Sequence, residues 1–147
     1  MRLNSLLFGL VGLAICLLAV PAGAQLLEPP SKEKPAEASE EDRVKVAEKG
    51  LEGKTDLVML YAEGLCCPSC AIGIRKKISV LDFVDASGSN QGVELDPKFQ
   101  LVTLNIKKDQ AVDLKKLALA IDDAGYNPVR FYTMEKGALV TKKLQVK

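Results

Sequence analysis

The sequence predicts an α+β fold in which one four-stranded antiparallel sheet carries two helices on one face. Three observations lead to this prediction. β-prone residues fill four short segments, apolar residues recur every three or four positions in two others, and the six segments follow the order β-α-β-β-α-β. Placing both helices on one face of a single sheet is the simplest way to bury their apolar sides.

The first strand is predicted over residues 57–63, where alternation puts Val58, Leu60 and Ala62 on one face. A cysteine-rich stretch follows, and then a helical pattern. Its apolar residues stand three or four positions apart, at Ala71, Ile74, Ile78 and Leu81. We expect this helix to start at Pro68, because the amide that proline lacks is one that the first helical turn leaves unpaired anyway.

Four further elements complete the predicted fold. In chain order they are strands over residues 93–95 and 101–106, a helix over 114–124 and a strand over 129–133. The two middle strands are close enough in sequence to form a hairpin. Asp113 is the expected N-cap of the second helix, and Gly125 is its expected C-terminal stop.

Composition excludes several functional classes. The chain has 147 residues, with 20 basic and 19 acidic side chains and no histidine. A net charge of +1 gives no general attraction to a nucleic acid backbone, so nucleic acid is not an expected partner. Without histidine, His-based general base catalysis, Ser-His-Asp triads and imidazole zinc sites are impossible. Any chemistry must therefore use sulfur or oxygen.

The first 24 residues are predicted to be a secretory signal peptide. Arg2 precedes an apolar run over residues 6–20 and the small residues of a cleavage site after Ala24. An uncleaved membrane anchor is one alternative, but the run is shorter than the ~20 residues of a spanning helix. Lipid attachment at Cys16 is another, which Ile15 disfavours because a lipobox has a small residue there. We expect an exported protein, periplasmic or extracellular after cleavage.

Three regions follow the predicted cleavage site. Residues 25–54 are rich in Pro, Glu and Lys and are predicted to be a flexible linker, with a short helix over residues 39–49 capped by Ser39. Residues 55–133 form the predicted domain. Residues 134–147 are predicted to be a C-terminal tail, either frayed or forming an extra edge strand.

After cleavage, the remaining cysteines are Cys66, Cys67 and Cys70, which lie too close together to staple distant segments. If the helix starts at Pro68, Cys67 is its N-cap and Cys70 is its third residue. Both sulfurs then face outward at the helix end, whose dipole favours thiolates. Two such thiolates could hold one soft cation or form a disulfide, and the spacing alone does not decide between these outcomes.

The cysteine loop also carries a family resemblance. Residues 64–70, Gly-Leu-Cys-Cys-Pro-Ser-Cys, and the helix after them resemble the Gly-Met-Thr-Cys-x-x-Cys loop and first helix of heavy-metal-associated domains. Residues 117–128 resemble the second helix of that family and its Ala-Gly-Tyr ending. The family includes copper chaperones, modules of copper-transporting ATPases and periplasmic mercury-binding proteins. The resemblance covers residues 56–132 and agrees with a ferredoxin-like β-α-β-β-α-β sandwich.

The resemblance implies roles for four residues, and the sequence departs from the family's pattern at a fifth, Cys66. Cys67 and Cys70 would be the two metal ligands, and Leu65 replaces the family's Met, a buried side chain that anchors the loop from below. Tyr126 matches an aromatic position near the metal loop, although a core tyrosine that ends a helix is an equally good interpretation. Cys66 replaces the family's Thr and could be a third thiolate ligand, a disulfide partner or a small side chain without a role.

The ligand set favours a soft metal. Thiolates select Cu(I) and other soft ions, so Cu(I) is the first choice and Hg(II) the second. A structural zinc site needs four ligands, which three cysteines without histidine cannot supply within one chain.

The leading hypothesis is a non-enzymatic carrier, a metallochaperone or scavenger that exchanges its metal with a thiolate-bearing transporter or acceptor protein. One alternative is a thiol-disulfide oxidoreductase that uses the same Cys-x-x-Cys pair. The other is an interaction or sensory module in which the cysteines are an inert disulfide or a metal-responsive switch. Arg75, Lys76 and Lys77 could dock an acidic partner beside the loop, or could simply be the solvated face of the helix.

Overall fold

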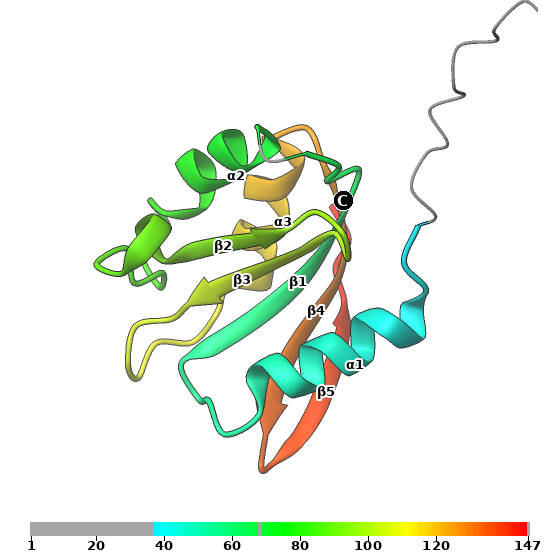
Figure 1. Cartoon of the computed structure of the whole chain (residues 1–147). Coiled ribbons are helices and arrows are strands. Elements are labelled where there is room, and N and C mark those ends of the chain that lie inside the picture. The colour runs from blue at the N-terminus through cyan, green and yellow to red at the C-terminus, as the bar shows by residue number, and fades with distance from the viewer. Residues whose placement is uncertain (1–36, 68, 147) are drawn as a thin grey trace, which may run out of the picture. The chain divides into compact units, whose positions relative to one another are not determined.

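The computed structural model describes residues 37–67 and 69–146, except for the side chain of Cys70 (Figure 1). These residues belong to one compact unit, Glu33–Lys147. The predicted signal peptide, the candidate lipidation site Cys16 and the first part of the predicted linker lie outside the described residues. Within the described ranges, no helix has the length and apolar character needed to span a membrane.

The helices and strands follow the predicted order, with one added element before β2 and others at both ends. The elements are α1 (Glu40–Leu51), β1 (Leu57–Glu63), α2 (Cys70–Ile78), the 3-10 helix η1 (Ser89–Gly92), β2 (Val93–Asp96), β3 (Leu101–Asn105), α3 (Leu114–Asp122), β4 (Asn127–Glu135) and β5 (Ala138–Lys143). The α+β class is therefore confirmed, and each of the six predicted segments holds an element of the predicted type.

The strands form one antiparallel sheet in the order β2-β3-β1-β4-β5 (Figure 1). The predicted hairpin is confirmed, because β2 pairs directly with β3. The predicted number of four strands is wrong, because β5 pairs along β4 from Ala138 to Lys143. Of the two alternatives for the C-terminal segment, the edge strand is the one observed. It adds backbone hydrogen bonds that a frayed tail would lack.

One face of the sheet is covered by α2 and α3, as predicted. The core on this side contains the predicted inner face of β1 and the apolar stripes of both helices: Val58, Leu60, Ala62, Ile74, Ile78, Leu117 and Ile121. α3 begins after its predicted N-cap, Asp113, and the chain turns at Gly125, whose φ of +89° favours glycine. The periodicity of the two helices therefore predicted most of the buried side chains, whereas Leu81 lies beyond the end of α2 and is only partly buried.

The other face of the sheet is covered by α1, which corrects the predicted linker. Ala47 and Leu51, four residues apart on α1, are fully buried against Met59 and Tyr61 of β1 and Tyr132 of β4. The short helix predicted over residues 39–49 is observed with its predicted N-cap, Ser39, but it packs on the sheet instead of lying in a flexible linker. The uninterrupted apolar run of β1 already indicated that both faces of this strand are covered.

A buried arginine fixes α1 on the sheet. The Arg43 guanidinium lies over the Tyr61 ring, 3.9 Å from its centroid, and Nε donates a hydrogen bond to the Phe99 carbonyl at 2.9 Å. Glu37 accepts hydrogen bonds from both Arg43 Nη2, at 3.3 Å, and the Tyr61 hydroxyl, at 3.0 Å. Burial and the hydrogen bond to Glu37 raise the pKa of Tyr61 to about 12. The second half of the predicted linker is therefore part of the folded domain.

Candidate functional site

The cysteine loop joins the end of β1 to the start of α2, and its first residue lies against the turn that follows α3. Gly64 has a φ of +95°, which favours glycine. A Cβ atom on Gly64 would lie 3.7 Å from Cδ1 of Tyr126, so the tyrosine ring packs beside the start of the loop. Next to this contact, Asn127 Nδ2 donates a hydrogen bond to Glu63 Oε2 at 2.6 Å. Two segments more than sixty residues apart in sequence thus meet at the base of the loop.

Leu65, the residue just before Cys66 and Cys67, lies in the core. Its side chain is fully buried in the cluster that also contains Ile74 of α2 and Leu117 of α3. Tyr126 is half-buried and packs against the same cluster. The Tyr126 ring therefore lies between the core and the start of the loop, and its role beside a metal stays a prediction.

The described cysteines differ in exposure. Cys66 is exposed and Cys67 is half-buried. The Cys67 Sγ atom lies 3.0 Å from the hydroxyl oxygen of Ser69, within hydrogen-bond distance. Pro68 and the side chain of Cys70 lie outside the described residues. Sulfur of this loop is thus accessible to solvent at Cys66 and, in part, at Cys67.

The start of α2 differs from the prediction. The helix begins at Cys70 rather than Pro68, so Ser69 is the N-cap and Cys70 is the first helical residue, not the third. At this end of the helix, the Ile72 amide donates a hydrogen bond to the Ser69 carbonyl, three residues earlier, at 3.3 Å, which is the spacing of a 3-10 turn. Cys67 therefore lies in the loop, two residues before the N-cap. The prediction located the helix from proline's preference for a first turn, which is compatible with a loop as well.

Ser69, whose hydroxyl lies beside the Cys67 sulfur, is not among the residues that the sequence predicted for the site. A serine before a helix predicts a cap for the backbone amides, but the Ser69 side chain makes no capping hydrogen bond in α2. The first turn of α2 also contains no acidic residue. The pattern Cys-Pro-Ser-Cys contained the relevant signal, since a hydroxyl two residues from a thiol can reach it.

The basic run on α2 separates into three different environments. Arg75 is half-buried, and its Nε donates to the carbonyl of Val93 at 3.0 Å, which ties α2 to β2. Lys77 Nζ lies 3.8 Å from Asp123 Oδ2 in an exposed ion pair. Lys76 is exposed, on the same side of the helix as Ile72. The predicted docking run is therefore not one uniform cationic surface.

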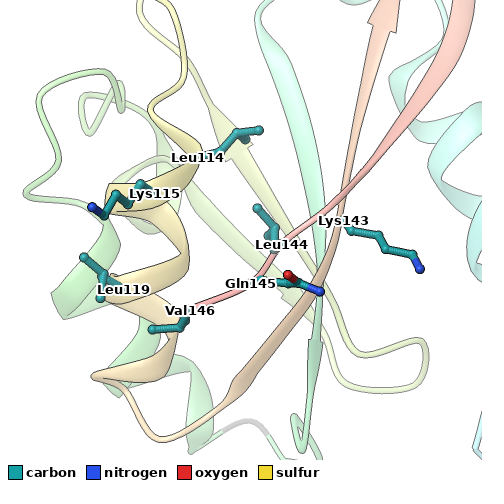
Figure 2. Close-up of a pocket in the computed structure, with 7 residues that line it drawn as sticks. All are labelled: Leu114, Lys115, Leu119, Lys143, Leu144, Gln145 and Val146. Carbon is teal, nitrogen blue, oxygen red and sulfur yellow. The ribbon is translucent and has the colours of Figure 1, made fainter.

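A groove elsewhere on the domain has a different chemical character. It lies between α3 and the residues that follow β5, as Figure 2 shows. Its lining combines leucine and valine with lysine and glutamine: Leu114, Lys115, Leu119, Lys143, Leu144, Gln145 and Val146. None of these side chains is a thiol or a carboxylate, so the groove offers neither a soft-metal ligand nor an acid-base pair.

Among the described side chains, no three His, Cys, Asp or Glu residues gather as a metal site. Because the Cys70 side chain is outside that search, the predicted pair of Cys67 and Cys70 stays a prediction, and so does a third ligand at Cys66. The thiols of the loop remain the softest donors that the described chain offers.

Comparison with known proteins adds no relative. No protein-family model, no curated protein and no solved structure matches the chain. Only the residues of the cysteine loop and their surroundings therefore indicate what this protein does.

Proposed function

We propose that this chain is an exported, non-enzymatic carrier of a soft metal ion, which it binds through Cys67 and Cys70. The single observation that supports this proposal most strongly is the position of the cysteine loop: it is anchored by Leu65, flanked by Tyr126 and open to solvent at Cys66. A site that exchanges its ion with another protein needs both a rigid base and an accessible sulfur.

The surrounding fold also supports the proposal. The strand order β2-β3-β1-β4, with α2 and α3 on one face, is the order of a ferredoxin-like sandwich, to which β5 and α1 are added. We therefore propose that residues 55–133 are a heavy-metal-associated domain with this fold. The cargo is Cu(I) in the first place and Hg(II) in the second, since thiolates favour soft ions over Mg²⁺ or Ca²⁺.

The proposal is tested by anaerobic titration of the reduced chain 25–147 with Cu(I). We expect about one ion per chain, with binding lost when Cys67→Ser and Cys70→Ser are combined, because two thiolates are needed to hold the ion. Unchanged binding in the double variant would refute the proposed site. Cys66→Ser is the matched control: retained affinity identifies a two-sulfur site, and a loss of about tenfold or more identifies Cys66 as a third ligand.

The oxidoreductase alternative is less well supported. All neighbouring strands are antiparallel, and a hairpin separates α2 from α3, whereas a thioredoxin-type fold has a β-α-β crossover there. Turnover in an insulin reduction assay would favour this alternative. Thiol quantification in protein recovered from the exported fraction separates the carrier from an inert interaction module: the carrier requires reduced cysteines, and a permanent disulfide contradicts it.

A further inference from the structure

Helix α2 starts differently from the other two α-helices of the described chain. At α1, the Ser39 hydroxyl accepts the amide of Asp42, and at α3 the Asp113 carboxylate accepts the amides of Lys115 and Lys116. Ser69 occupies the same N-cap position at α2 but accepts none. Its hydroxyl lies instead 3.0 Å from Cys67 Sγ.

The backbone accounts for this difference. Ser39 and Asp113 have extended conformations, with ψ of 160° and 98°, which bring a cap side chain over the first amides. Ser69 has helical angles, φ −67° and ψ −27°. Its capping hydrogen bond is therefore absent because of the local fold, and the hydroxyl is available to the cysteine that precedes it.

A hydroxyl beside a metal-binding sulfur has a defined chemical role. A thiolate can only accept hydrogen bonds, so next to the ionised sulfur Ser69 must be the donor. Such partners of a metal ligand fix the ligand's orientation, and their loss commonly weakens metal binding about 10- to 100-fold. No carboxylate in the first turn of α2 competes for this hydroxyl.

We infer that Ser69 is a positioning residue for Cys67: its hydroxyl donates a hydrogen bond to the sulfur and holds that sulfur in the orientation that binds a soft metal ion. The inference rests on the proposed function for its metal, but the contact itself belongs to the metal-free chain. It assigns Ser69 to the site, although the family pattern leaves that position open.

The test compares Cu(I) affinity, measured in competition with a colorimetric Cu(I) chelator, for chain 25–147 and three serine variants. We expect Ser69→Ala to lose about tenfold in affinity, and Ser69→Thr, which keeps the hydroxyl, to retain it. Ser79→Ala, at the other end of α2, is the matched control and should match the wild type.

A metal-free measurement separates failure of this inference from failure of the proposed function. In the reduced apoprotein, the ¹³Cβ chemical shift of Cys67 should change in Ser69→Ala and return in Ser69→Thr. If the wild type binds no Cu(I), the proposed function fails and the shift still tests the contact. An unchanged shift in Ser69→Ala, or a Cu(I) affinity of Ser69→Ala equal to that of the wild type, would overturn the role of Ser69.

Discussion

The N-termini of α1 and α3 are built for stability, whereas the N-terminus of α2 is built around the cysteine loop. Ser39 and Asp113 each satisfy backbone amides of their own helices. Ser69 contacts Cys67 instead, and the first turn of α2 contains no acidic residue. Leaving a helix start without a side-chain cap commonly costs about 1 kcal/mol. The helix that follows the cysteine loop therefore lacks the stabilising side-chain cap that the other two helices have.

What replaces the cap at α2 is burial. Leu65 lies in the core immediately before Cys66 and Cys67, so core packing holds the loop in place of a side-chain cap on its helix. The comparison therefore predicts that the loop depends on apolar packing, while the other two helix starts depend on hydrogen bonds.

The largest expected effect follows from Leu65→Ala. Truncating a fully buried leucine removes apolar contacts and leaves a cavity, so we expect a loss of about 2–5 kcal/mol in the free energy of unfolding, measured by urea denaturation. Leu119→Ala is the matched control: Leu119 is 41% exposed, so its truncation should lower the free energy of unfolding much less. Equal losses in the two variants would show that the loop is not anchored by burial.

A smaller effect is expected for Asp113→Ala. The carboxylate accepts two amides of α3, at 3.0 and 3.1 Å, so its removal should cost about 1–2 kcal/mol of stability. Asp113→Asn keeps an acceptor of the same shape and should retain most of the stability. If Asp113→Asn loses as much stability as Asp113→Ala, then the charge of the carboxylate, rather than its capping hydrogen bonds, stabilises this helix.

Ser39→Ala should lower the free energy of unfolding somewhat less, by about 0.5–1 kcal/mol, because a single amide loses its partner. The Ser39 hydroxyl also donates to Asp42 and lowers the pKa of that carboxyl. A lowered pKa in the folded state contributes stability above the unfolded pKa, and this contribution disappears as the pH falls through the folded value. The difference between wild type and Ser39→Ala should therefore shrink below about pH 4, which thermal unfolding across a pH series will measure.

The smallest effect on stability is expected for Ser69→Ala. Because Ser69 caps no amide, its unfolding free energy should stay within about 0.5 kcal/mol of the wild type in urea denaturation. A loss as large as that of Ser39→Ala would mean that Ser69 is an ordinary helix cap, and the contrast among the three helix starts would be lost.

Much of the fold could be predicted from local patterns. The apolar spacing at Ile74, Ile78 and Leu117 predicted which helix faces are buried, and Asp113 and Gly125 predicted where α3 starts and turns. Such signals depend on residues three or four positions apart, which are neighbours on a helix however the rest of the chain folds. The loop itself was found in the same way, from three cysteines beside a helical pattern.

Local patterns in the chain specify the types and order of the predicted elements, their apolar faces and the presence of sulfur at one loop. Three features emerge only in the folded chain: α1 covers the second face of the sheet, β5 extends its edge, and Ser69 lies against Cys67 instead of capping α2. The two groups of features differ in the range of the interactions that produce them. Periodicity and capping act within one or two helical turns, whereas burial of a second sheet face and the backbone angles at Ser69 depend on segments that only folding brings together.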